Sequence, residues 1–275
     1  MSPPTRWEIF WRTVIGRAYP RVIGAQRERS WLFFETLLPL LQVSAFVFIY
    51  RAIQAPPEFT GFVVLGGAMM AYWLNVLWSM AAQFYWEKET GNLELYIIAP
   101  TSLMAILLGM AIGGIVFSTV RSAAVITVGL LLFRVDIAIV SVPQLLGVFL
   151  LTLVALYGLG MLFSSLFLLY GRQAWHLSDL LQEPVYLVSG FYFPVRALGI
   201  AAALGASVIP ITLGLDAMRQ LLFPTMMAQF HFLDVGVELG VLAVLSVAFV
   251  WLAKRVLAYV EDLSRREGRL TIRGQ

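Results

Sequence analysis

Residues 145–170 read LLGVFLLTLVALYGLGMLFSSLFLLY, and this run contains no charged side chain. About 20 apolar residues in a helix are enough to span the hydrocarbon core of a bilayer. The backbone groups of a segment in lipid need internal hydrogen-bond partners, which only helices and closed barrels provide. Barrel strands alternate apolar and polar residues, and this run does not. The stretch therefore predicts a membrane-spanning helix.

Five further apolar runs lie elsewhere in the chain. They cover residues 31–50, 62–86, 103–133, 177–193 and 237–257. Of all 275 residues, 60% are hydrophobic and 13% are charged, whereas soluble domains have about 45–50% and about 25%. We therefore expect an all-α membrane protein with six transmembrane helices within residues 31–258. The run at 177–193 is the weakest pattern because it is short and contains Pro184.

The first 30 residues combine aromatic and basic side chains. Trp7, Trp11 and Ile15 belong to a set of apolar residues that alternate with arginines at roughly helical spacing. Basic amphipathic helices with aromatic residues lie in the membrane interface. The sequence therefore predicts a cytoplasmic interfacial helix over residues 1–30, with a solvated tail as the alternative. The segment lacks the apolar core of a signal peptide.

The basic residues predict the orientation of the six crossings. Fourteen of the 19 Lys and Arg lie in the two tails and in the loops that share their side of the membrane. Four lie on the opposite side, and Arg121 lies inside a crossing. Cytoplasmic loops carry the excess of Lys and Arg. We therefore expect both chain ends in the cytoplasm, with a basic tail at residues 259–275.

The stretch between the fifth and sixth runs is apolar but irregular. Residues 198–211 are too few for a confident crossing. Residues 213–223 form an amphipathic pattern, with Asp216 and Arg219 three positions apart and able to pair on the polar side. We expect an extracellular region at residues 194–235 whose short helices are re-entrant or lie on the membrane surface.

The loop at residues 86–101 is the one sizeable polar loop between crossings. It begins WEKETGNLELYIIAP, so three carboxylates (Glu87, Glu89 and Glu94) stand against one lysine. An acidic cytoplasmic loop runs against the usual excess of Lys and Arg, which indicates a surface for a protein partner; an ordinary solvated turn is the alternative. Gly91 permits a sharp turn, and Asn92 can cap a short helix.

This loop resembles the cytoplasmic loop of type-2 ABC transporter permeases of the drug- and sodium-efflux branch. The shared pattern is Glu-x-Glu-x-Gly-x-Leu-Glu from Glu87, with Asn92 where the family usually has Thr. A second match follows downstream in three pieces: SGFYFPV at 189–195, IPIT at 209–212 and DAMR at 216–219. The motifs occur in the family's order, and the resemblance covers nearly the whole chain.

The resemblance implies a permease subunit of an ATP-driven exporter in a bacterial or archaeal inner membrane. Such a subunit pairs with a second permease, identical or different, and with two nucleotide-binding subunits that hold ATP and Mg²⁺. The loop would be the coupling helix. The residues that contact the ATPase, or shape the surface that does, would be Glu87, Glu89, Gly91, Leu93 and Glu94. Residues 5–29 would be a connecting helix that slides along the inner face. Phe191, Tyr192 and Phe193 would close the outer end of the path.

The chain itself has no phosphate-binding P-loop. That motif needs a lysine directly after a glycine, but Lys88 follows Glu87 and Lys254 follows Ala253. We therefore expect no enzymatic activity and no cofactor in this chain. The absence of cysteine and the wide separation of the two histidines give no metal-ligand pattern.

Polar residues inside the predicted crossings are further candidates. We hypothesise that Arg121 and Glu183 pair at similar depth, either lining a substrate path or holding two helices together. Glu35, near the inner end of the first crossing, is expected to extend to the interface. Tyr72, Trp73 and Asn75 could line a cavity, although aromatic residues in membrane helices serve packing more often.

Other functions are less well supported by the sequence. The same architecture could export a lipid-linked polysaccharide or another glycoconjugate instead of a small amphiphile. An ion-coupled secondary transporter needs several buried acids near the membrane centre, and Glu183 alone qualifies. A membrane enzyme needs a cluster of acid and histidine side chains, for which His176, Asp179 and Glu183 are too sparse.

Overall fold

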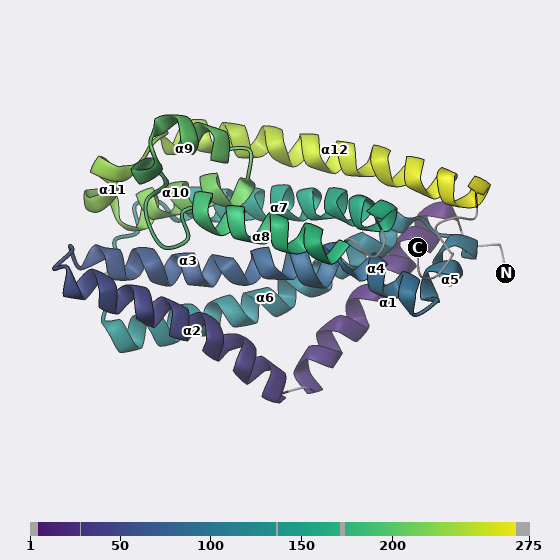
Figure 1. The fold of residues 1–275 in the computed structure, drawn as a ribbon, viewed down its shortest axis with the longest axis horizontal. Coiled ribbons are helices and arrows are strands. Elements are labelled where there is room, and N and C mark those ends of the chain that lie inside the picture. Colours follow the sequence, from purple (N-terminus) through teal and green to yellow (C-terminus); the bar gives the residue numbers. More distant parts are fainter. Residues whose placement is uncertain (1–4, 28, 136, 171–173, 268–275) are drawn as a thin grey trace.

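The computed structural model of the protein describes residues 5–27, 29–135, 137–170 and 174–267. Every regular element within these ranges is helical, and the long helices run side by side along one axis (Figure 1). Parts of the predicted N-terminal segment, the predicted loop at 171–176 and the predicted basic tail lie outside the described residues. The all-α architecture expected from the sequence is confirmed.

The elements are named in chain order. The long ones are α1 (Arg6–Arg27), α2 (Arg29–Ala52), α3 (Glu58–Leu74), α6 (Leu103–Phe133), α7 (Val142–Tyr170), α8 (Ala174–Val188) and α12 (Val235–Glu267). The short ones are the π-helix η1 (Asn75–Ala81), α4 (Gln83–Glu89), α5 (Asn92–Ile98), the 3₁₀ helix η3 (Val195–Leu198), α9 (Ile200–Ala206), α10 (Pro210–Leu222) and α11 (Pro224–Phe230).

Five spans in the described residues are long and apolar enough to cross a membrane. They are Phe33–Ala52, Glu58–Glu89, Leu103–Phe133, Val142–Leu168 and Val235–Leu263. A sixth is reached if α9 and α10, which are bent by 114° at their junction, count as one span. The protein is therefore a multi-pass membrane protein.

The path of the chain needs one more traverse, and α8 makes it. Helices α7 and α12 run parallel, since Ser246 Oγ of α12 donates to the Leu151 carbonyl of α7 at 3.1 Å and Val250 lies against Gly158. The chain between them must therefore return along the bundle, and α8 lies along α7 in that position (Figure 1). The fifth predicted crossing is thus shorter than expected, because its helix of 15 residues ends at Val188.

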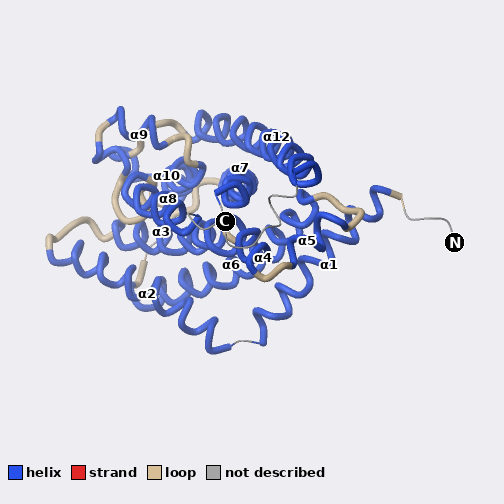
Figure 2. Tube along the Cα trace, turned by 45° about the vertical axis from the view of Figure 1, so that its right-hand side comes forward, coloured by secondary structure: helices blue, strands red, loops and turns tan. Residues whose placement is uncertain are grey.

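Helix α3 and its continuation through η1 form the buried axis of the bundle. Helices α2, α6, α7 and α10 pack around them, and Figure 2 shows α7 beneath α12 on one side of this axis. At the end of η1 the Ala82 amide donates to the Leu77 carbonyl at 3.2 Å, five residues back. This wider turn interrupts the α-helix in the middle of the second crossing.

The predicted region before the last crossing contains the sharply bent pair of helices α9 and α10. Pro210 occupies the first turn of α10, where its missing amide hydrogen costs nothing. The expectation of a polar side on this helix is wrong, because Asp216 and Arg219 are as buried as Leu215 and Met218. Contacts from α3, α7, α11 and α12 surround it.

Helix α1 packs against α6 rather than standing free. A Cβ added to Gly109 would lie 2.5 Å from the Val14 carbonyl, and one added to Gly113 would lie 2.9 Å from Arg21 Cβ. These two glycines, four apart, let the backbones approach closely. The other side of α1 exposes Trp7, Trp11, Ile15 and Tyr19 at intervals of four residues, as an interfacial helix would.

Candidate functional site

The loop singled out in the sequence folds into two short helices joined at a sharp turn, which we call the elbow (residues 83–98). Helix α4 ends at Glu89, and α5 begins at Asn92. Gly91 joins them with a φ of 82°, a left-handed conformation that favours glycine. The Asn92 side chain donates to Thr90 Oγ1 at 3.2 Å and does not cap α5, so the predicted capping role is wrong.

The acidic residues of the elbow have different surroundings. Glu87 is only 6% exposed and points into the protein, whereas Glu89 and Glu94 are exposed to solvent. Leu93 is buried and anchors α5 to the core. The structure therefore brings the predicted coupling residues together in one small unit, but it turns Glu87 inward.

Glu87 faces inward because α1 supplies its counter-charge. Arg17 forms an ion pair with Glu87, and Gln83 Nε2 donates to the same carboxylate oxygen at 3.0 Å. The guanidinium of Arg17 also lies 5.0 Å from the centre of the Tyr96 ring. Burial raises the pKa of Tyr96, while the charge of Arg17 opposes that rise. One arginine of α1 thus contacts both helices of the elbow.

A second arginine of α1 reaches the π-helix. Arg21 donates to the Ser79 carbonyl within η1 and to the Met110 carbonyl of α6 at 3.3 Å. Burial, with the neighbouring charge of Arg17, lowers the pKa of Arg21 to about 10. The guanidinium therefore stays charged at neutral pH. Arg17 and Arg21, four residues apart, connect α1 with the elbow, η1 and α6.

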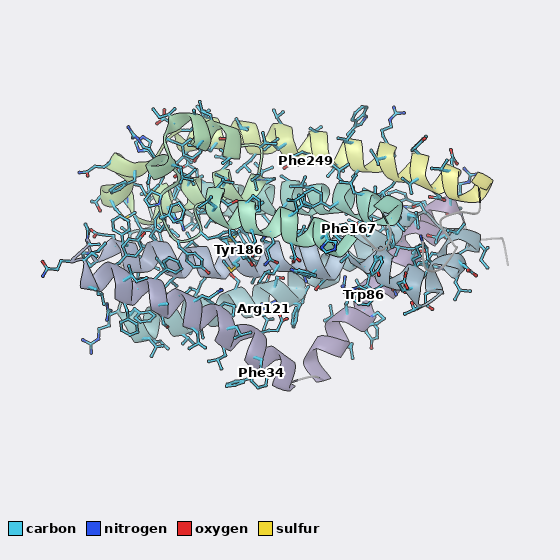
Figure 3. The ribbon with its side chains drawn as sticks, in the orientation of Figure 1. Phe34, Trp86, Arg121, Phe167, Tyr186 and Phe249 are labelled. Atoms are coloured by element: carbon cyan, nitrogen blue, oxygen red, sulfur yellow. The ribbon has the colours of Figure 1, made fainter. Side chains whose placement is uncertain are left out.

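The outer side of α5 is apolar. Leu95 is 58% exposed and Ile98 is 78% exposed, and we call these two side chains with the flanking Glu89 and Glu94 the elbow ridge. The last turns of α12 lie beside it, where Glu261 Oε2 accepts from the Leu103 amide at 3.5 Å. Trp86, on α4, marks this end of the bundle in Figure 3.

Inside the bundle, Arg121 does not pair with Glu183. It forms an ion pair with Glu35 of α2 and donates to the Glu35 carbonyl at 3.1 Å. Helix α6 packs against α2, so the guanidinium reaches that helix, and Arg121 is labelled on this side of the bundle in Figure 3. Glu35 is therefore the partner of Arg121, and Glu183 lies exposed on α8.

The three polar or aromatic residues predicted in the second crossing are all buried, and Tyr72 lines a cavity. Tyr72 lines a cavity of about 400 Å³ between α3, α6, α7 and α10, and its hydroxyl lies 3.0 Å from Thr119 Oγ1. Asn75 Oδ1 accepts from the Tyr157 hydroxyl at 2.9 Å. Trp73 packs in the core, and its Nε1 has no hydrogen-bond partner among the described residues.

The aromatic residues predicted as an outer gate lie against the core. Tyr192 stacks on Phe46 of α2 with ring centres 4.1 Å apart, and its hydroxyl donates to Gln42 Oε1 at 3.2 Å. Phe191 is buried, and Phe193 is half-buried. The turn that carries them is held by a residue the sequence reasoning did not assign to the site.

That residue is Arg219. It donates to the carbonyls of Gly190 at 2.6 Å, Phe191 at 2.9 Å and Phe62 at 2.9 Å. Its guanidinium carbon lies 3.3 Å from the centre of the Phe62 ring. No ion pair joins it to Asp216 in the described part of the chain. The sequence contains a signal for this role, because an arginine in an apolar stretch needs partners inside the protein.

Comparison with known proteins identifies the family. No curated protein matches the sequence. The family model for the ABC-2 type transporter matches residues 21–223, which include the end of α1, the elbow, α6 to α8 and the buried helix α10. This match covers well over half of the 275 residues. The chain therefore belongs to the ABC-2 type transporter family, as a membrane-embedded permease subunit that works with an ABC ATPase subunit.

Proposed function

We propose that this permease belongs to an ATP-driven exporter and that its elbow docks on the ATPase subunit in the cytoplasm. A second permease, identical or different, completes the pore. The cargo is an amphiphilic molecule that leaves a bacterial or archaeal cell across the inner membrane. ATP and Mg²⁺ belong to the ATPase subunits, because this chain has no P-loop.

The observation that carries the proposal is the elbow ridge. Leu95 and Ile98 are apolar and largely exposed, and α5 lies outside the five candidate spans. Adjacent exposed apolar residues with a polar rim are typical of a protein interface. Glu89 and Glu94 supply an acidic rim, which favours a partner surface with basic groups.

The contacts that attach the elbow to the rest of the bundle support a role in transmitting movement. Arg17 fixes both helices of the elbow to α1, and Arg21 fixes α1 to η1 in the centre of the second crossing. A displacement of the elbow by a partner would therefore reach α1, α3 and α6 together. These contacts support the connecting and coupling roles inferred from the family, although they favour a clamped α1 over one that slides freely.

For the translocation path, we favour the side formed by α2 and α8. Ile49 of α2 and Leu180 and Leu187 of α8 are exposed apolar residues of these two helices. Asp179 and Glu183 are also exposed on α8. A carboxylate facing lipid at the membrane centre costs about 2.5–3.5 kcal/mol, so these acids support a wet cavity closed by the second permease. Phe191, Tyr192 and Phe193 would bound its outer end.

The docking role can be tested by placing a charge on the ridge. Ile98→Asp should abolish co-purification of the partner ATPase subunit, because an ionised side chain cannot be buried unpaired in an apolar interface. It should also abolish the stimulation of ATPase activity by the permease. The measurement is affinity purification of the co-expressed complex, followed by ATPase assays in lipid nanodiscs.

Ile53→Asp is the matched control. Ile53 is 67% exposed just after α2, at the opposite end of the bundle. The control variant should assemble and stimulate the ATPase as the wild type does. If the Ile98→Asp complex assembled with wild-type yield and activity, the elbow would not be the docking site.

A further inference from the structure

Two buried carboxyl groups meet where helix α10 packs against the start of α12. Asp216 is 3% exposed on α10, and Glu238 is 0% exposed in the first turn of α12. Gln220 lies between them, and its Nε2 donates to Asp216 Oδ2 and to Glu238 Oε2 at 3.0 Å each. The same nitrogen also donates to the Leu233 carbonyl at 2.8 Å. Three acceptors therefore share the two hydrogens of one neutral amide.

No basic side chain makes contact with this pair in the described residues. Arg219 gives its hydrogen bonds to three backbone carbonyls and acts on Asp216 through its charge. Asp234, in the loop before α12, adds a negative charge. Of the other elements against α10, α7 and α11 contain no charged residue, and α3 contains only Glu58. Two ionised carboxylates in this environment would be strongly unfavourable.

The position of the two carboxyl groups shows how the charge is reduced. Asp216 Oδ2 and Glu238 Oε2 both lie 3.0 Å from the same Gln220 nitrogen, so the two carboxyl groups are close neighbours. An ionised carboxylate only accepts hydrogen bonds, so a bond between two carboxyl groups requires a proton on one of them. Glu238 Oε1 is buried and has no donor among the residues that the structure describes. This oxygen is therefore the place for the proton.

We propose that Asp216 and Glu238 form a proton-binding site that holds one shared proton at neutral pH and joins α10 to α12. Loss of the proton leaves two negative charges facing each other in a buried joint, which pushes the helices apart. Because Arg219 on α10 also holds the turn at residues 190–191, loosening of this joint reaches the aromatic residues of that turn.

The thermal stability of the purified full-length chain in detergent tests the proposal. The folded chain keeps a proton that the unfolded chain releases above about pH 4–5. Stability is therefore complete at acidic pH and is lost as the pH rises. The melting temperature of the wild type should fall steadily between about pH 5 and about pH 9.

Three variants separate the proposal from simpler explanations. Glu238→Gln carries an amide that cannot ionise. The slope of its melting temperature against pH should therefore be markedly smaller, and its melting temperature at alkaline pH should exceed that of the wild type. The control Asp262→Asn, which changes an exposed carboxylate near the other end of α12, should keep the wild-type slope. An unchanged slope in Glu238→Gln overturns the proposal. An unchanged slope in Asp216→Asn would assign the proton to Glu238 alone and overturn the sharing.

A metal cation is the competing ligand for a pair of acids. Replacing Na⁺ by choline at constant ionic strength, with and without a chelator of divalent ions, should leave the melting temperature unchanged if a proton is bound. A melting temperature that falls on removal of Na⁺ or of divalent ions would show that the site binds a metal ion, which contradicts the proposal.

Discussion

At the scale of single residues, Arg121 shows how a charge is tolerated inside the membrane. Its guanidinium is almost fully buried. It forms an ion pair with the carboxylate of Glu35 on α2 and donates a hydrogen bond to the backbone carbonyl of the same residue. Such bidentate partners offset the cost of removing the charge from water. The pair also fixes α2 to α6 at a point where α2 otherwise has few buried side chains.

This arrangement predicts different effects for two glutamates. Glu35→Gln removes the counter-charge of Arg121 and should lower the free energy of unfolding by about 1–3 kcal/mol, since the carboxylate is partly exposed and the full cost of a buried unpaired charge is discounted. The check is chemical or thermal unfolding of the purified chain.

Glu183→Gln is the matched control, because it makes the same chemical change on exposed α8. Its stability should stay within about 0.5 kcal/mol of the wild type. Equal destabilisation by the two variants would mean that Arg121 depends on Glu183 as much as on Glu35.

Single residues also show where sequence reasoning reached its limit. The turn at Gly91 followed from local chemistry and is observed. The inward orientation of Glu87 could not be predicted, because it depends on Arg17, 70 residues earlier in the chain. The predicted pairing of Arg121 with Glu183 was wrong for a similar reason. The depth of a residue in the membrane follows from the sequence, but the rotation of α6 toward α2 follows from packing.

At the scale of elements, the contact of α1 with α6 depends on two small residues. Gly109 and Gly113 leave room for the backbone of α1, and the Thr13 and Thr101 hydroxyls lie 2.9 Å apart at its other edge. The chain has no cysteine, so a Thr13→Cys/Thr101→Cys pair would report this contact without background.

Gly109→Leu should separate α1 from α6. The new side chain would overlap the Val14 carbonyl, so the yield of the disulfide between positions 13 and 101 should fall several-fold in membranes treated with a mild oxidant. Gly147→Leu on α7, where an added Cβ meets only Leu239 at 3.9 Å, should leave the yield unchanged. Undiminished cross-linking in Gly109→Leu would refute the close contact.

At the scale of the whole molecule, the orientation in the membrane is the most accessible prediction. We expect the elbow in the cytoplasm and the turn after α2 outside, so Ile98→Cys should resist a membrane-impermeant maleimide added to intact cells while Ile53→Cys reacts. Both positions are highly exposed, so burial in the chain does not explain a difference. Labelling of Ile98→Cys in intact cells would reverse the assigned orientation.

Much of the overall architecture could be predicted because it depends on long apolar runs. Five spans and the irregular region before the last one are recognisable from length and composition. The sequence already marked the fifth run as short, but it did not reveal the burial of α10, since that burial depends on neighbouring helices. A helix surrounded on all sides can bury Asp216 and Arg219 when each has internal partners, which no periodicity of the sequence reports.

The π-helix in the second crossing has a consequence for the ancestry of the chain. A relative that lacks one residue between Asn75 and Ala81 would run as a regular α-helix, and the segment beyond it would keep its orientation because the wider turn absorbs the extra residue. Glu87 would still face Arg17, whereas the Ser79 carbonyl would accept a hydrogen bond within the regular helix and leave Arg21. A shorter segment and the loss of Arg21, but not of Arg17, should therefore occur together among descendants of a common ancestor.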